Sequence, residues 1–320
     1  MSVLDRPRTT TTTTTAAGTT TAGTSTAARK GARFGLALAA VATVVWSGNF
    51  VVARALHDTV PPIQTAFWRW VIALLAVLPL AWPQLRAQWP HLRRHAGYLT
   101  LASLLGIACF NTFIYQAGQS TSATNMAVIA AASPLLIVAF DRLAGRRIGG
   151  RRATGMLIAL AGVLALVAKG SPAALLGLDF ATGDLWMLAA GATFAGYSVL
   201  LRRRPKEISG IVFLCATFAL GVLVLAPVYA ISVSVQGGFA PTMSTVGPLL
   251  YVGVFSSAIA YFTWNKAVAL VGAARAGIVY YLQPLVVAVL SFALLGEAVT
   301  AVQLGCMAVI VAGVALAAKE

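Results

Sequence analysis

Two stretches of this chain resemble each other and decide how it is organised. Residues 115–148 read YQAGQSTSATNMAVIAAASPLLIVAFDRLAGRRI, and residues 265–299 read NKAVALVGAARAGIVYYLQPLVVAVLSFALLGEAV. Pro134 in the first stretch corresponds to Pro284 in the second, at a shift of 150 residues, and Gly145 corresponds to Gly296 at a shift of 151. The sequence therefore predicts a duplicated architecture with units of about 140 residues.

The composition around these stretches excludes an ordinary water-soluble globule. Of the 320 residues, 59% are hydrophobic and 10% are charged, against about 25% charged residues in a typical soluble domain. Ten apolar stretches approach the roughly 20 residues that a helix needs to cross a bilayer. They are 34–55, 61–82, 96–117, 121–140, 153–169, 181–201, 209–233, 247–269, 274–295 and 300–318. The alternation typical of a membrane barrel is absent, so we predict an all-α integral membrane protein with ten transmembrane helices.

Residues 1–33 differ from the rest of the chain. Twelve of the first 30 residues are threonines, with an unbroken run from Thr9 to Thr15. A segment with so little to bury predicts a disordered tail. A cleaved signal peptide over 29–55 is the alternative, but its apolar run exceeds a usual signal segment and further apolar segments follow.

The basic residues predict the orientation, because Lys and Arg accumulate on the cytoplasmic side of a membrane. With the N-terminus inside, 19 of the 23 bases fall in cytoplasmic segments. The positions are 6, 8, 29, 30, 33, 86, 93, 94, 142, 146, 147, 151, 152, 202, 203, 204, 206, 275 and 319. Both termini are therefore expected in the cytoplasm. The net charge of +15 is a topology signal, and nucleic-acid binding is not indicated.

The two predicted units, residues 34–169 and 180–319, each hold five helices. Because five is odd, the second unit must lie inverted in the membrane relative to the first. The junctions at Gly145 and Gly296 agree with this, since Arg146 and Arg147 follow the first and Glu297 follows the second. Inverted five-helix repeats are typical of secondary transporters, whose substrate site lies near the midplane between the repeats.

Several motifs resemble the EamA family of the drug/metabolite transporter superfamily. They are Trp46-Ser47-Gly48-Asn49-Phe50 with Arg54, Phe67-Trp68-Arg69, the prolines Pro134 and Pro284, and Leu294-Leu295-Gly296-Glu297. The first repeat departs from the pattern, with Arg146 at the glutamate position. The resemblance, which runs from about residue 34 to 319, implies an inner-membrane carrier, commonly an exporter of amino acids or related metabolites. It also implies a central cavity between the third, fourth, eighth and ninth helices.

Arg69 is the strongest candidate for a substrate-binding residue. It lies within the second predicted helix, where a charge facing lipid costs a few kcal/mol on insertion scales, so it should face the bundle interior. A planar guanidinium suits a substrate carboxylate. A structural clamp on backbone carbonyls, or a side chain reaching out to the membrane surface, is the alternative.

Other polar and aromatic residues of these helices could line the same site. Asn111 and Tyr115, and likewise Tyr261 and Asn265, are four residues apart and so share a helix face. Simple interhelical hydrogen bonding is the alternative for these pairs. Trp46 and Asn49 on the first helix, and Tyr281 before Pro284, could complete the lining. Pro134 and Pro284 predict helix breaks, either at the ligand or as static kinks.

The sequence lacks the motifs that indicate nucleotide hydrolysis or a metal site. We find no P-loop and no HExxH, and the three cysteines lie far apart in apolar runs, so no cofactor, metal site or enzyme activity is indicated. No carboxylate falls mid-helix, and Glu297 is expected to cap a helix end. We therefore expect a secondary exporter of amino-acid-like metabolites. A broader drug-efflux carrier or a membrane scaffold without transport is the alternative, and a homodimer is compatible with the sequence.

Overall fold

Every regular element in the described part of the chain is a helix. The computed structural model describes residues 21–131, 133, 136, 150–167, 181–201, 203–271, 279–280 and 282–318. Its elements are α1 (Thr21–Ala55), α2 (Pro62–Arg94), α3 (Ala96–Ser103), η1 (Leu104–Cys109), α4 (Phe110–Ala117), α5 (Ala123–Ala131), α7 (Gly150–Val167), α9 (Thr182–Leu201), α10 (Gly210–Gln236), α11 (Met243–Leu250), η2 (Tyr251–Ile259), α12 (Ala260–Val271), α14 (Gln283–Leu295) and α15 (Ala301–Ala318).

Six helical stretches among these are long and apolar enough to cross a membrane. They are Gly31–Ala55, Pro62–Arg94, Ala96–Ala117, Thr182–Leu201, Gly210–Gln236 and Met243–Trp264. The apolar helices Ala153–Leu166, Gln283–Leu295 and Ala301–Gly313 are shorter. The prediction of an all-helical membrane protein is thus confirmed in its class, while the number of ten spans stays a prediction.

Two helices extend more than ten residues beyond their predicted bounds. α1 begins at Thr21, so residues 21–33, which we expected in the disordered tail, are helical; residues 1–20 lie outside the described part. Extending an existing helix costs less than starting one, because the unfavourable step is nucleation. α2 continues to Arg94 rather than ending near residue 82, because its last turns pack against α10.

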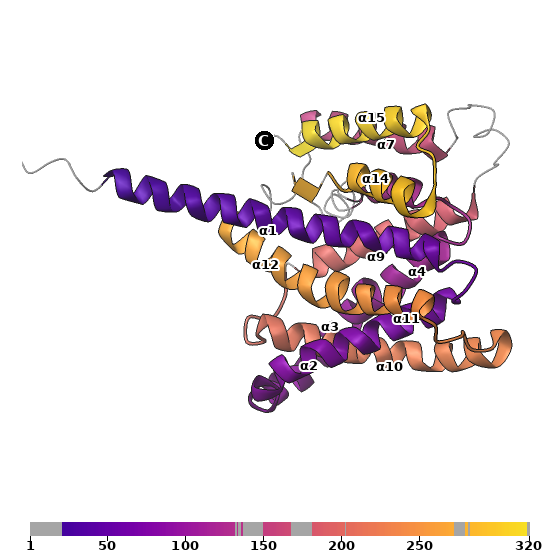
Figure 1. The fold of residues 1–320 in the computed structure, drawn as a ribbon. Helices are drawn as coiled ribbons and strands as arrows, with labels where there is room; N and C mark the ends of the chain where they lie inside the picture. Colours follow the sequence, from indigo (N-terminus) through magenta and orange to yellow (C-terminus); the bar gives the residue numbers. More distant parts are fainter. Residues whose placement is uncertain are drawn as a thin grey trace, which may run out of the picture.

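The helices run in roughly one direction and stack in layers, with α7 and α15 at the top of Figure 1, α1 across the middle, and α2 and α10 at the bottom. Small residues allow α7 and α15 to pack closely against each other. A Cβ added to Gly313 of α15 would lie 2.5 Å from the backbone nitrogen of Ala159 in α7. Large apolar side chains, such as Leu223, Ile231 and Phe292, are more than 60% exposed, which suits contact with lipid.

Two of the long stretches contain a π-helical turn. η1 interrupts the helix from Ala96 to Ala117, and η2 interrupts the helix from Met243 to Val271. They lie in the third and eighth predicted spans, which are equivalent positions in the predicted repeats. π-helical turns frequently occur at functional sites, because they change the direction of the side chains that follow.

Candidate functional site

Arg69 lies at the centre of a buried hydrogen-bond network. It is the eighth residue of α2, and its side chain belongs to a residue that is 2% exposed. Its Nε donates to the Ser257 hydroxyl at 2.9 Å, and its NH1 donates to Asn49 Oδ1 at 2.5 Å and to the Tyr115 hydroxyl at 2.9 Å. Tyr115 in turn donates to Asn49 Oδ1 at 3.0 Å. One guanidinium therefore joins α1, α2, α4 and η2.

Glycines at two close approaches place the partners of Arg69. A Cβ on Gly253 would lie 2.5 Å from the Ile72 side chain, so only glycine lets η2 approach α2 this closely and bring Ser257 to Arg69. A Cβ on Gly48 would lie 2.3 Å from the Tyr251 hydroxyl, which donates to the carbonyl of Val45 at 2.8 Å. The glycine before Asn49 thus lets α1 pack against the same segment.

The three side-chain atoms that accept hydrogen bonds from Arg69 are all neutral oxygens. Among the described residues the ion pairs are Arg54 with Glu297 and His57 with Asp58, so no described carboxylate neutralises Arg69. A guanidinium does not give up its proton, and a buried charge without a counter-charge is costly. Among the described residues, the network therefore holds the cation in place with neutral dipoles alone.

Asn111 presents a second unusual group. It lies one helical turn before Tyr115 on α4 and is 1% exposed, and neither its amide nitrogen nor its amide oxygen has a hydrogen-bond partner. Buried side-chain amides are nearly always paired, because leaving a polar group unpaired in an apolar interior costs about 1–3 kcal/mol. This amide is therefore an unsatisfied polar group within the bundle, one helical turn from Tyr115.

An aromatic cluster lies on the side of the network where α1 meets α12. The ring of Trp46 lies 5.5 Å from that of Tyr261, 5.3 Å from that of Trp264 and 6.1 Å from that of Tyr280. The indole nitrogen of Trp46 donates to the carbonyl of Ser256 at 2.9 Å. All four residues are half-buried, and their rings form an aromatic wall beside the network.

Of the remaining predicted site residues, the structure describes some and not others. Pro284 lies in the first turn of α14, where its missing N–H costs no helical hydrogen bond. Gln283 beside it is 1% exposed, and its Oε1 has no partner. Pro134, Tyr281 and the side chain of Asn265 lie outside the described residues.

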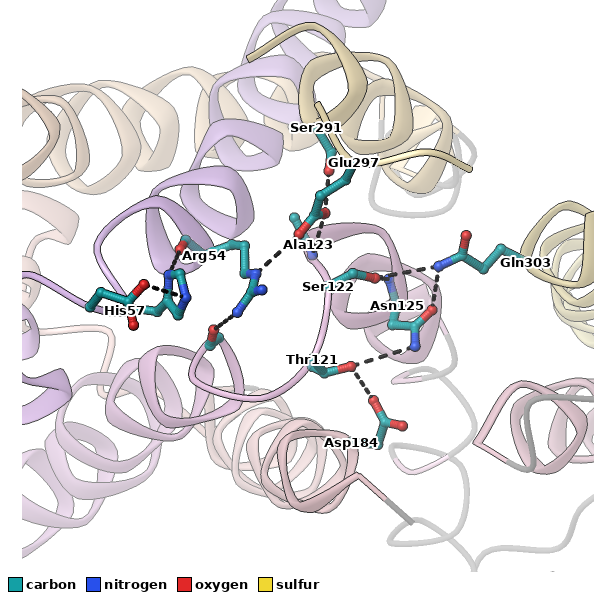
Figure 2. Close-up of polar contacts among 12 residues, drawn as sticks. Arg54, His57, Thr121, Ser122, Ala123, Asn125, Asp184, Ser291, Glu297 and Gln303 are labelled. Atoms are coloured by element: carbon teal, nitrogen blue, oxygen red, sulfur yellow. Dashed lines mark hydrogen bonds and ion pairs between the residues drawn. The ribbon is translucent and has the colours of Figure 1, made fainter. Parts of the chain in front are cut away.

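A second polar network, which sequence reasoning missed, ties the helix ends on one side together (Figure 2). Arg54 at the end of α1 pairs with Glu297 at 3.1 Å and donates to the carbonyl of Gly118 at 3.2 Å. Glu297 also accepts from the Ser291 hydroxyl and, at 3.2 Å, from the backbone amide of Ala123, the first residue of α5. The expected capping role of Glu297 is thus found on α5 rather than on a helix next to it in sequence.

The same network continues through the start of α5 to α9 and α15. Gln303 donates to Asn125 Oδ1 at 2.7 Å, and Thr121 donates to the buried carboxylate of Asp184 at 2.5 Å. These contacts join residues more than 60 positions apart and connect the first half of the chain to the second (Figure 2). The only signal for this network in the sequence was that Arg54 and Glu297 lie in the quoted motifs.

A polar cavity of about 280 Å³ opens beside this network. Its lining includes His57, Asp58, Pro61, Gln119 and Gln236, and His57 Nε2 lies 2.9 Å from Asp58 Oδ2. Within the described ranges, no group of three or more His, Cys, Asp or Glu side chains could hold a metal ion.

Comparison with known proteins agrees with this architecture. The model of the EamA-like transporter family matches residues 33–168 and, a second time, residues 181–318. An uncharacterized transporter of Archaeoglobus fulgidus is 26% identical over 274 residues, covering 81% of this chain and 89% of that protein. A probable terminal-alkyne amino-acid exporter of Streptantibioticus cattleyicolor is 24% identical over 262 residues, covering 81% of this chain and 85% of that protein.

The fold also matches a solved structure. A protein of known crystal structure superposes with a TM-score of 0.57 at 22% identity, covering 88% of this chain and 96% of that one. With the family model matching both halves and six helical stretches fit to span a bilayer, the chain is a multi-pass membrane protein that belongs to the EamA-like transporter family.

Proposed function

We propose that this protein is a secondary transporter that exports amino acids or related small metabolites by alternating access. The observation that carries the proposal is Arg69, a buried cation held by three neutral side chains with no carboxylate partner among the described residues. In this proposal the substrate carboxylate supplies the missing negative charge. Charge-assisted hydrogen bonds of this kind are about twice as strong as neutral ones.

The rest of the proposed site suits the other parts of such a solute. The free amide of Asn111 offers one donor and one acceptor near Tyr115, and Trp46 and Tyr261 offer an aromatic wall to an apolar side chain. Asn265 and Tyr281 complete the proposed lining from the second half of the chain. An amino-acid exporter among the relatives supports the same substrate class.

The proposed architecture is two inverted five-helix repeats, 34–169 and 180–319, with the site between them. The placement of η1 and η2 in the third and eighth spans supports this, since each π-helical turn lies in or next to a segment that carries site residues. The distribution of bases supports an inner-membrane protein with both termini in the cytoplasm. Rocking of one repeat against the other would open the site to either side.

A broader drug-efflux carrier is the second candidate. Efflux of cationic compounds calls for a buried carboxylate, whereas the buried charge at this site is a guanidinium. A scaffold without transport would need no amide left unpaired, yet Asn111 has no partner. Both observations favour the carrier of carboxylate-bearing solutes.

Counterflow in proteoliposomes tests the proposal. Purified protein is reconstituted into vesicles preloaded with one unlabelled amino acid at a time, and uptake of the labelled compound is followed, with organic cations as the comparison set. We expect saturable counterflow of at least one carboxylate-bearing amino acid and none of the cations. Arg69→Gln should lower the rate on the order of tenfold to a hundredfold, since a hydrogen bond to a charged group contributes about 1.5–3 kcal/mol.

The same substitution at an exposed arginine, Arg151→Gln, is the control and should transport normally. Thermal unfolding in detergent shows whether Arg69→Gln remains folded, and Arg69→Lys, which keeps the charge, provides a milder variant. Normal counterflow by a folded Arg69→Gln protein would exclude this residue as the carboxylate-binding group.

A further inference from the structure

The end of α2 carries a tandem sequence repeat that the transport site does not use. Residues 82–88 read WPQLRAQ and residues 89–95 read WPHLRRH, so the pattern Trp-Pro-x-Leu-Arg occurs twice at a spacing of seven. Except for His95, both copies lie within α2, and all of their residues but Trp82 lie beyond the predicted span of 61–82. A seven-residue spacing returns each residue type to nearly the same face of a helix.

The repeat produces one stripe of exposed side chains: Trp82, Arg86, Trp89 and Arg93. Their spacings of four, three and four residues place them along one helix face. Trp82 and Trp89 are both 57% exposed, and Arg86 and Arg93 are exposed as well. Two indoles therefore alternate with two guanidiniums along about three helical turns.

The rest of this segment is fixed against the bundle. Leu92 is buried in a cluster with Leu99 and Phe213. Gln88 and Gln84 accept hydrogen bonds from the backbone amide and the hydroxyl of Ser209, at 2.8 and 2.7 Å. Figure 1 shows this end of α2 at the lower left, beside the start of α10. The stripe is thus held rigidly outward.

The length of α2 places the stripe near a membrane surface. The helix has 33 residues, or about 50 Å, against about 30 Å of hydrocarbon. About 20 helical residues cross the hydrocarbon, and 20 residues counted from Pro62, the start of α2, end at Ala81. The stripe, which begins at Trp82, therefore begins where the hydrocarbon ends. Trp is enriched at that level, and arginines just outside it meet lipid phosphates.

The stripe arginines have no acidic neighbour in the described residues. The two ion pairs found there involve neither Arg86 nor Arg93. The nearby acid is Glu207, and it lies close to Arg94, His91 and His95. A hydrogen bond from its own backbone amide, and then these cationic or titratable neighbours, lower the pKa of its carboxyl. The positive charge on the stripe is free to attract an external anion.

We propose that the stripe formed by Trp82, Arg86, Trp89 and Arg93 is a binding surface for the headgroups of anionic phospholipids. The guanidiniums contact the phosphates, and the indoles lie at the level of the ester groups beneath them. The surface would hold the end of α2, and α10 packed against it, at a fixed depth in the bilayer. This inference concerns lipid and does not depend on which solute is carried.

Lipid-induced stabilisation of the purified full-length protein tests the proposal. Thermal unfolding is measured in a mild detergent with added phosphatidylglycerol, and separately with zwitterionic phosphatidylcholine. Two alanine variants are compared with the unaltered protein: Arg86→Ala with Arg93→Ala, and, as a control of equal charge loss, Arg151→Ala with Arg203→Ala, both exposed positions outside the stripe. Arg86→Lys with Arg93→Lys keeps the charge and is the milder stripe variant.

We expect phosphatidylglycerol to raise the melting temperature of the unaltered and control proteins more than phosphatidylcholine does. In the Arg86→Ala, Arg93→Ala variant the phosphatidylglycerol concentration for half of this effect should rise on the order of tenfold, and the lysine variant should keep most of the response. An unchanged response in the alanine stripe variant, or an equal loss in the control variant, would overturn the proposal. If the alanine stripe variant does not fold, a lysine variant that keeps a full preference for phosphatidylglycerol supports the proposal, and one without any preference contradicts it.

Discussion

The clearest single-residue feature is the contrast between two buried asparagines. Asn49 Oδ1 accepts hydrogen bonds from both Arg69 and Tyr115, whereas neither polar atom of the Asn111 amide has a partner. Both side chains belong to residues that are at most 5% exposed. The same residue type therefore has opposite effects on stability: Asn49 holds the network together, whereas the unpaired amide of Asn111 costs free energy.

We predict that Asn111→Leu raises the melting temperature while it lowers transport. Leucine has nearly the shape of asparagine and removes an unpaired polar group, which should stabilise the protein by about 1–2 kcal/mol. Gain of stability with loss of function is the usual pattern when a strained binding residue is replaced. Thermal unfolding in detergent and counterflow in vesicles measure the two effects.

Asn49→Leu is the matched control, because the same change there removes the oxygen that accepts hydrogen bonds from both Arg69 and Tyr115. It should lower the melting temperature. If Asn111→Leu is also destabilising, its amide has partners that lower the cost of burial, and its proposed role as a free group for substrate is wrong.

Sequence spacing predicted part of this site and could not predict the rest. The four-residue interval correctly placed Asn111 and Tyr115 on one helix, but only Tyr115 reaches Arg69. Ser257 was not predicted, because it lies in η2, where the π-helical turn changes the direction of side chains from that of a regular helix. Hydropathy alone does not locate such turns.

At the scale of helices, glycines set the distance between α7 and α15. A Cβ at Gly313 would lie 2.5 Å from the nitrogen of Ala159 and 2.7 Å from the oxygen of Gly155, which are backbone atoms that no side-chain rotation can move. Gly305 lies on the same helix, and a Cβ there would have nothing within 4 Å. In a bilayer, close packing of small residues is a main source of helix association.

We predict opposite effects for the same substitution at these two positions. Gly313→Ala should destabilise the protein by about 1–3 kcal/mol, because α15 must move away from α7. Gly305→Ala should be neutral or stabilising by up to about 1 kcal/mol, because alanine has the higher helix propensity. Thermal unfolding of the two variants under one condition checks this, and equal melting temperatures would show that the α7–α15 contact is looser than the structure has it.

The sequence predicted which segments form long helices, but it did not predict where those helices end. Apolar runs located all six of the long stretches, because a bilayer demands continuous hydrophobicity. The extension of α2 through residues 83–94 is polar and contains Pro83 and Pro90, so the sequence predicted a connecting segment. Packing of Leu92 and the hydrogen bonds of Gln84 and Gln88 to Ser209, which are tertiary contacts, decide its conformation.

At the scale of the whole molecule, the two family-matched halves, 33–168 and 181–318, are joined by polar contacts at two depths. Arg69 and Ser257 join them in the buried centre, and Arg54 and Glu297 join them at the helix ends. In the rocking motion proposed above, contacts at the helix ends would have to break and re-form while the bundle stays intact. The two networks therefore have different consequences when they are removed.

We predict that Arg54 and Glu297 are energetically coupled and that exchanging them restores only part of the stability. Arg54→Glu alone places two carboxylates together and should lower the melting temperature, as should Glu297→Arg alone. The double exchange recovers the ion pair, which contributes about 1 kcal/mol at this partial exposure. Recovery stays incomplete because an arginine at position 297 cannot accept the hydrogen bonds of Ala123 and Ser291. A double-mutant cycle of unfolding free energies measures the coupling, and strictly additive effects would show that the pair does not connect the two halves energetically.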